Sequence, residues 1–217
     1  MLTIQCDFDD TITVDNVGAA LLTRFAVDQK AWQQIDEEYH AGCITVEECN
    51  RRQFAHVRVG KREIQEFVKR EVEVRPGFAE MVSFCRSNGI RFVIVSNGID
   101  FYIDAILGKL GLSGVERYSG RARVTEKGID IDYIDPTGAR VERGFKMACQ
   151  RHLRGAKRPI VCIGDGLADI EPALAADHVI ARSRLLNHFH SQGLPHFPYE
   201  DFYEVKSYLE ELQRLYR

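Results

Sequence analysis

The sequence predicts an α/β domain with a mostly parallel sheet and a helical segment inserted after the first strand. Short runs rich in Val and Ile recur along the chain, and a helical pattern follows each run. The runs are nearly continuous in apolar residues rather than alternating, which is typical of parallel strands covered on both faces. The expected strands are Leu2 to Cys6, Arg91 to Val95, Pro159 to Ile163 and His178 to Ala181.

Helical patterns lie between the expected strands, and two of them end at glycines. Phe78 to Asn88 ends before Gly89, and Phe101 to Leu110 ends before Gly111. Glycine readily takes the left-handed backbone that terminates a helix. In Phe145 to Leu153, apolar residues recur four positions apart and form one face. This alternation of strand and helix indicates a sheet with right-handed crossovers.

The segment from Asp15 to Val72 interrupts the alternation because its pattern is helical throughout. Asp15 and Asp28 are expected helix N-caps, and Thr45 with Glu48 has the pattern of a capping box. A segment of this length is too long for one crossover, so we expect it to pack as a small bundle of its own. The expected division is a core of residues 1–14 and 73–217 and a helical insertion of residues 15–72.

A second exception is the segment from Arg121 to Val141. Its residues alternate in character around Asp135-Pro136-Thr137-Gly138, which is a strong turn sequence. We therefore expect short antiparallel strands in this part of the chain.

The composition limits the classes of protein to consider. With 217 residues, 45% hydrophobic and 28% charged, the chain has the size and balance of one globular domain with an insertion. Its 29 basic and 32 acidic residues give a net charge of −3, which disfavours nucleic-acid binding. No run approaches roughly 20 apolar residues and no secretory signal is visible, so we expect a cytoplasmic protein that does not enter membranes. The six cysteines form no C-x-x-C pair, and Cys6 and Cys162 are expected to be buried thiols.

The first strand ends in an unusual concentration of negative charge, Asp7-Phe8-Asp9-Asp10-Thr11. Like charges this close repel and raise one another's pKa, unless a cation lies between them. Carboxylate oxygens are hard ligands that suit Mg²⁺. In open α/β sheets the carboxyl ends of the strands are where ligands bind. The pattern therefore indicates a cation site at this edge of the sheet.

Three further segments are expected to meet at the same edge. The second strand ends in Ser96-Asn97-Gly98, where a hydroxyl and a free N–H can hold phosphate oxygens. The third ends in a segment that runs from Gly164 to Asp169 and adds two carboxylates four residues apart, Asp165 and Asp169. Lys146, near the start of the preceding helix, can offset phosphate and carboxylate charge.

In this order and spacing, the four segments resemble the motifs of the haloacid dehalogenase-like (HAD) superfamily. Residues 7–11 match its D-x-D-x-T motif, Ser96 the second motif, Lys146 the third, and residues 164–169 the G-D-G-x-x-D motif. The helical insertion resembles the C1 cap of the phosphoserine-phosphatase-like branch, and Arg75-Pro76-Gly77-Phe78 matches the segment where that branch leaves its cap. The resemblance implies a Rossmann-like HAD core and Mg²⁺-dependent phosphomonoester hydrolysis.

The resemblance also implies a role for each motif residue. Asp7 is the expected nucleophile, which forms an aspartyl-phosphate, and Asp9 the expected general acid and base. Lys146 is expected to stabilise the charge of the transferred group. The segment implied to bind the phosphoryl oxygens is Ser96, Asn97 and Gly98. The implied Mg²⁺ ligands are the Asp7 carboxylate, the Asp9 main-chain carbonyl and Asp165, with Asp169 either as a further ligand or as a residue that supports the ligands.

The insertion is expected to select the substrate. Where phosphoserine phosphatases carry a Glu and an Arg that pair with the substrate's charges, alignment places Asn16 and Gln53. Neither residue supplies a charge, so a small phosphate ester with an uncharged tail is favoured. A shifted alignment, in which the neighbouring Asp15, Arg51 and Arg52 partly restore the charged pair, is the alternative. The segment Asn97 to Tyr102 and the tail Leu194 to Glu204 resemble the 2-hydroxy-3-keto-5-methylthiopentenyl-1-phosphate phosphatases of methionine salvage.

Other functions remain open from the sequence. Phosphoserine is one alternative substrate, and transfer of the phosphoryl group to an alcohol is an alternative reaction. A non-catalytic binding protein of the same fold is a third alternative, although it predicts the loss of a motif residue, and all four motifs are present. The sequence pattern does not fix the oligomeric state.

Overall fold

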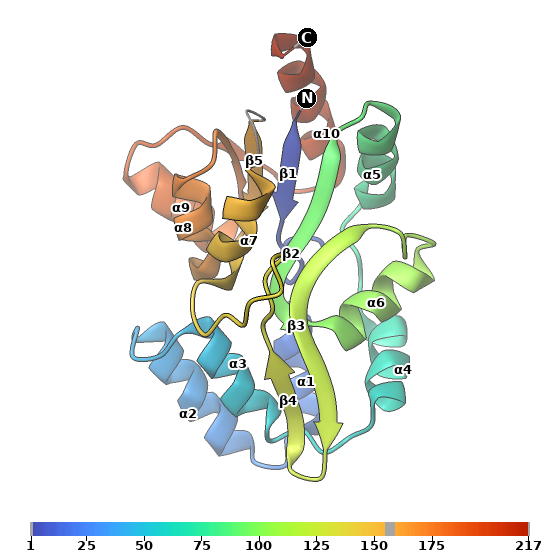
Figure 1. Cartoon of the computed structure of the whole chain (residues 1–217), viewed down its shortest axis with the longest axis vertical. Coiled ribbons are helices and arrows are strands. Elements are labelled where there is room, and N and C mark those ends of the chain that lie inside the picture. The colour runs from blue at the N-terminus through green and yellow to red at the C-terminus, as the bar shows by residue number, and fades with distance from the viewer. Residues whose placement is uncertain (1, 155–158, 217) are drawn as a thin grey trace.

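The computed structural model of the chain describes residues 2–154 and 159–216 and confirms the α/β class. A seven-stranded sheet has the order β4-β3-β2-β1-β5-β6-β7. Figure 1 labels the strands β1 to β5 of this sheet. Neighbouring strands are parallel except for the antiparallel pair β3 and β4. The strands are β1 (Thr3–Cys6), β2 (Arg91–Ile99), β3 (Glu116–Thr125), β4 (Gly128–Asp132), β5 (Ile160–Gly164), β6 (His178–Ala181) and β7 (Phe197–Pro198).

The four strands predicted from the apolar runs are β1, β2, β5 and β6, in the buried middle of the sheet. β1 lies between β2 and β5, with Cys6 opposite both Ile94 and Ile163. The carboxyl ends of the three strands therefore lie together, and the segments that follow them start from one place at the edge of the sheet.

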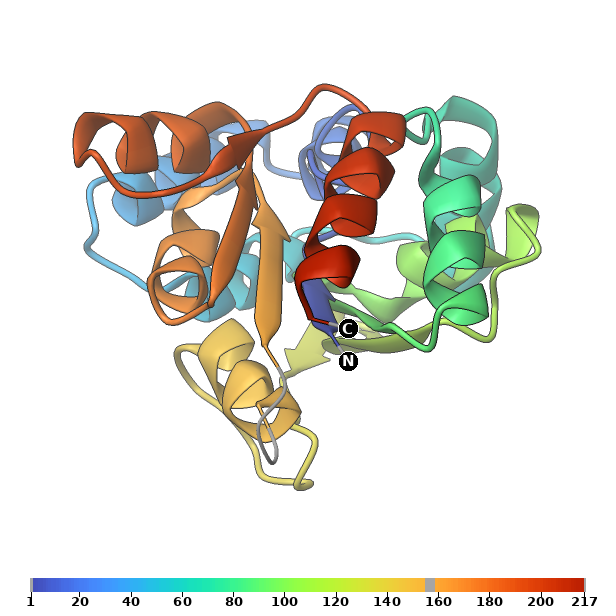
Figure 2. The same cartoon turned by 90° about the horizontal axis from the view of Figure 1, so that it is seen from above.

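Helices cover both faces of the sheet. Figure 2 shows α7 on one face and α10 with α5 on the other. Gly89 and Gly111 follow α5 and α6 at φ 64° and 69°, which confirms the predicted helix ends. No helix in the described ranges is long and apolar enough to cross a membrane. The helices after the insertion are α5 (Phe78–Ser87), α6 (Asp100–Lys109), α7 (Phe145–Leu153), α8 (Ile170–Leu174), α9 (Ser183–Ser191) and α10 (Phe202–Leu215).

The antiparallel strands were predicted correctly, but the turn that joins them was not. β3 and β4 pair from Thr125 opposite Gly128, so their connection comes before the predicted Asp135–Gly138 turn. That turn closes a shorter bridge between Ile134 and Arg140, where Gly138 N–H donates to Asp135 O at 2.9 Å. β3 also pairs with β2, so the hairpin extends the edge of the parallel sheet.

The insertion contains four helices, and local capping explains where they begin. Asp28 and Thr45 accept hydrogen bonds from Ala31 N and Glu48 N, as predicted. Asp15 was the wrong cap for the first helix, because Asn16 one residue later accepts from Ala19 N at 2.8 Å. The helices are α1 (Val17–Phe25), α2 (Gln29–His40), α3 (Val46–Phe54) and α4 (Lys61–Glu71).

Apolar residues of α1, α3 and α4 share the hydrophobic core of the sheet. Leu21, Phe54 and Ile64 are buried in the same hydrophobic cluster as Ile4 and Val93 of the central strands. The expected bundle is therefore joined to the sheet by continuous packing, and it forms one wall of the space above the carboxyl ends of the strands.

Candidate active site

The turn after β1 brings its carboxylates to the edge of the sheet. Asp7 is buried and Asp9 is half-buried. Asp10 takes a left-handed backbone with φ 57°, and Thr11 Oγ1 donates to Asp165 Oδ1 at 3.1 Å. This last contact ties the turn after β1 to the segment after β5.

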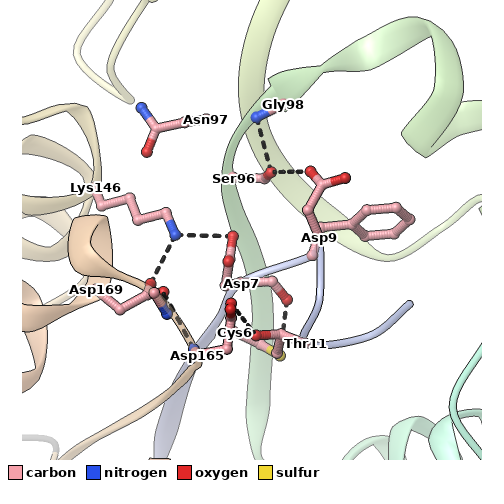
Figure 3. A network of polar contacts seen from close by, with 12 residues as sticks. Cys6, Asp7, Asp9, Thr11, Ser96, Asn97, Gly98, Lys146, Asp165 and Asp169 are labelled. Atoms are coloured by element: carbon pink, nitrogen blue, oxygen red, sulfur yellow. Dashed lines mark hydrogen bonds and ion pairs between the residues drawn. The ribbon is translucent and has the colours of Figure 1, made fainter. Parts of the chain in front are cut away.

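Lys146 lies between two of the buried carboxylates (Figure 3). Its Nζ is 2.8 Å from Asp7 Oδ1 and 2.7 Å from Asp169 Oδ1, and the lysine is 5% exposed. Burial alone lowers the pKa of Lys146, but the attraction of Asp169 and Asp7 outweighs it and raises the pKa. The lysine therefore stays protonated and places a fixed positive charge beside Asp7.

One lysine does not balance the acidic cluster. Oxygens of Asp7, Asp165 and Asp169 all lie within 4.8 Å of one another. Burial first, and the neighbouring Asp169 second, raise the pKa of Asp165 to about 7. Burial also raises the pKa of Asp7, and Lys146 opposes that rise. A divalent cation with oxygen ligands removes this repulsion, so the donor set fits such a cation.

Asp9 lies apart from the three clustered carboxylates, and each of its oxygens accepts a hydrogen bond. Val17 N, at the start of α1, donates to Oδ1 at 2.9 Å, and Tyr102 Oη donates to Oδ2 at 2.6 Å. Burial raises the pKa of Asp9 to about 6, against the effect of these hydrogen bonds. A carboxyl with such a pKa can both donate and accept a proton near neutral pH.

The end of β2 also supplies polar groups to this site. Ser96 Oγ accepts from Gly98 N at 2.9 Å and lies 3.5 Å from Asp9 Oδ2 (Figure 3). Gly98 N–H therefore supports the serine hydroxyl in this structure. The Asn97 side chain donates to Glu47 Oε1 at 3.3 Å, and its own Oδ1 is buried without a partner among the described residues.

The two insertion residues aligned with substrate-binding positions both line the cavity and both make internal hydrogen bonds. Asn16 caps α1 and donates to Asp10 Oδ2 at 3.1 Å. Gln53 is 4% exposed and donates to Trp32 O at 3.2 Å. Neither residue presents a charge to the cavity.

These groups surround a cavity of about 360 Å³ between the sheet edge and the insertion. Its floor carries Asp7, Asp9 and Lys146. Its opposite wall comes from α1, α2 and α3 and combines apolar side chains with the polar groups of Asp36, His40 and Asn50. Apolar residues of that wall are Leu22, Trp32, Val46 and Phe54. The cavity can therefore hold a phosphate group at one end and an apolar chain at the other.

Three residues near the site had no role in the sequence-based prediction. Glu47 and Tyr102 bond directly to Asn97 and Asp9. Arg75 belongs to a recognised motif, but its role appears only in the structure, where its Nε donates to Thr11 O at 3.1 Å. Each acts across a long sequence separation, so no local spacing could reveal it.

Comparisons with known proteins agree with this geometry. The model of the haloacid dehalogenase-like hydrolase family matches residues 4–174. The chain is 32% identical over 217 residues to a 2-hydroxy-3-keto-5-methylthiopentenyl-1-phosphate phosphatase of Brevibacillus brevis, covering 98% of this chain and 97% of that protein. It is 33% identical to the protein of the same name from Geobacillus kaustophilus, with coverages of 99% and 96%.

Solved structures of other proteins also resemble this chain in fold. A substrate-bound phosphoserine phosphatase complex matches with a TM-score of 0.71 and 20% identity, covering 95% of this chain and 97% of that one. A phospho-aspartyl intermediate analogue of phosphoserine phosphatase matches with a TM-score of 0.70, also at 20% identity, with coverages of 95% and 98%. At this identity the likeness concerns the fold alone.

Proposed function

The chain belongs to the haloacid dehalogenase-like hydrolase family and is a phosphatase, and we propose that it hydrolyses a small phosphomonoester through a phosphate carried on Asp7. The observation that carries the proposal is the contact of 2.8 Å between Asp7 Oδ1 and Lys146 Nζ at the floor of the cavity. It places a buried carboxylate next to a fixed cation, where an incoming phosphoryl group is neutralised.

The proposed reaction has two steps. In the first, an Asp7 oxygen forms a bond to phosphorus while the ester P–O bond breaks, and Asp9 gives its proton to the leaving oxygen. In the second, Asp9 takes a proton from water, the water oxygen attacks phosphorus, and the bond to Asp7 breaks to release phosphate. Ser96, supported by Gly98 N–H, donates to a phosphoryl oxygen, and Lys146 balances its charge.

We assign the divalent cation as Mg²⁺, held by Asp7, Asp165 and Asp169 together with the main-chain carbonyl of Asp9. The support is the oxygen-only donor set and the excess of negative charge described above. When bound, the cation would neutralise charge on the phosphate and on the carboxylates.

The substrate we propose is 2-hydroxy-3-keto-5-methylthiopentenyl-1-phosphate. Relatives that cover nearly the whole chain carry the name of its phosphatase. The cavity supports the same choice, because Leu22, Trp32 and Phe54 offer apolar contacts and because Asn16 and Gln53 carry no charge. Asp36 and Arg184 also line the cavity. Apolar surface removed from water contributes about 25 cal/mol per Å² to binding, which favours a thioether chain over a zwitterion here.

The nucleophile is tested with Asp7→Asn, with Asp15→Asn as the matched control on the exposed loop nearby. We expect Asp7→Asn to abolish phosphate release, since an amide does not attack phosphorus, while Asp15→Asn keeps wild-type turnover. EDTA should stop the wild-type enzyme, and added Mg²⁺ should restore it. Wild-type turnover by Asp7→Asn would refute the assignment.

The substrate is tested separately with a panel of phosphomonoesters. We expect the highest kcat/KM for 2-hydroxy-3-keto-5-methylthiopentenyl-1-phosphate and a much lower value for phosphoserine. A reversed order would overturn the proposed substrate and leave the aspartyl-phosphate mechanism in place. Added alcohols should not divert the phosphoryl group from water.

A further inference from the structure

A tyrosine outside the four motifs contacts the acid–base carboxyl directly. Tyr102 lies in the first turn of α6 and is 1% exposed. Its hydroxyl donates to Asp9 Oδ2 at 2.6 Å, which is a short hydrogen bond from a neutral donor. Its ring packs against Phe8, with the ring centroids 6.1 Å apart. Packing therefore helps to fix the phenol ring, in addition to its hydrogen bond to the carboxyl.

Gly98 makes room for this contact. A Cβ atom placed on Gly98 would lie 1.7 Å from Tyr102 Oη and 2.6 Å from Asp9 Oδ2. Any side chain at this position would push the phenol and the carboxyl apart. The glycine at the end of β2 and the tyrosine four residues later thus form one arrangement that converges on Asp9.

The contact fixes the orientation of Asp9. Its Oδ1 accepts from Val17 N and its Oδ2 accepts from Tyr102, so the carboxyl cannot rotate without losing both bonds. Oδ2 is also the oxygen 3.5 Å from Ser96 Oγ. The oxygen held by the phenol is therefore the one that faces the proposed phosphoryl site.

We propose that Tyr102 is a positioning residue, which holds Asp9 Oδ2 where it exchanges a proton with the ester oxygen; this inference rests on the proposed function of Asp9. Tyr102 keeps its own proton throughout. Its hydroxyl occupies one lone pair of Oδ2. The second lone pair of that oxygen is left for the proton that passes to the leaving group as the P–O bond breaks.

The test is Tyr102→Phe, assayed with p-nitrophenyl, phenyl and benzyl phosphate, whose leaving groups increase in basicity in that order. The p-nitrophenolate ion leaves without protonation, whereas benzyl alcoholate does not. General acids contribute about 10²- to 10⁴-fold to such reactions, so loss of positioning should lower kcat/KM for benzyl phosphate by at least about 10-fold. For p-nitrophenyl phosphate we expect a change within about threefold.

Tyr133→Phe is the matched control. Tyr133 is also fully buried, and its hydroxyl donates to Asn97 O at 2.6 Å rather than to Asp9. Its loss should affect the three esters equally. The ratio of kcat/KM between esters is measured on one sample and does not depend on the fraction of folded molecules, so poor folding of a variant leaves the test intact.

Two results would overturn the inference: wild-type kinetics in Tyr102→Phe, or an equal loss for all three esters. Either would leave the proposed function standing, since that depends on Asp7→Asn. Conversely, turnover by Asp7→Asn would remove the function itself, whatever Tyr102→Phe shows.

Discussion

Two neighbouring helices of the insertion, α2 and α3, meet the rest of the molecule in opposite ways. α3 docks through buried polar groups: Glu47, 1% exposed, accepts from Phe145 N at 2.8 Å and from Asn97 Nδ2 at 3.3 Å. Arg51 adds hydrogen bonds to the carbonyls of Ile131 and Val141. Between α2 and α9 a polar contact lies at the surface, where Arg184 Nη1 is 2.9 Å from His40 Nδ1.

The difference indicates which part of the insertion moves when the cavity opens. Pulling α3 away would leave a buried carboxylate and two buried N–H groups without partners, which costs several kcal/mol. Pulling α2 away breaks its surface contact with α9 and two contacts with α3, the Arg52–Glu38 pair and the hydrogen bond from Gln53 to Trp32 O. Exposed pairs such as the first two contribute about 1 kcal/mol or less each. We therefore expect α3 to stay on the core while α2, with Trp32 on the cavity wall, gives access to the site.

The largest expected effect comes from breaking the α3 contact. Glu47→Ala leaves Phe145 N and the Asn97 side chain unpaired, so we expect a loss of about 3 kcal/mol in the free energy of unfolding. Turnover should also fall, because the start of α7 carries Lys146. Urea unfolding and phosphate release measure the two effects.

The neighbouring glutamate provides the control for Glu47. The Glu48 side chain is 53% exposed, so Glu48→Ala should change the free energy of unfolding by no more than about 0.5 kcal/mol. If the two variants had equal stability, α3 would not be anchored by its buried carboxylate, and the contrast with α2 would disappear.

Much of the fold and the floor of the site followed from local rules. Apolar runs predicted the central strands, and the rule that parallel strands end at one edge brought Asp7, Ser96 and Asp165 together in advance. The contacts of the wall did not follow, because the sequence pattern singled out Glu48 as a capping residue and gave no sign that Glu47 faces α7. The error at Asp15 has the same origin, since Asn16 caps equally well and only the backbone path selects it.

A smaller effect is expected from the α2 contact. His40→Ala should leave global stability nearly unchanged and should accelerate amide hydrogen exchange within residues 29–40 by up to about fivefold. Exchange within residues 46–54 should not change. His152→Ala, an exposed histidine on α7, is the matched control and should leave both segments unchanged. If amide hydrogen exchange accelerated equally in both helices, they would open as one unit.

The smallest effect concerns the link between the two helices and depends on pH. Arg52 on α3 donates to both carboxylate oxygens of Glu38 on α2, at 2.6 and 3.2 Å. These hydrogen bonds lower the pKa of Glu38. The link therefore stabilises α2 above the ordinary carboxyl pKa of 4.5 and is lost as the pH falls through the lowered value.

Trp32, the one tryptophan of the chain, lies on α2 and reports on this link by fluorescence. Its emission should shift to longer wavelength in the wild type as the pH falls below 4.5 and Glu38 takes up a proton. Glu38→Gln should already show part of that shift at neutral pH and should have a smaller acid transition, since its amide does not titrate. Identical acid transitions in both proteins would show that Glu38 does not hold α2 to α3, and α2 would then depend on His40, on the hydrogen bond from Gln53 to Trp32 O and on its apolar packing.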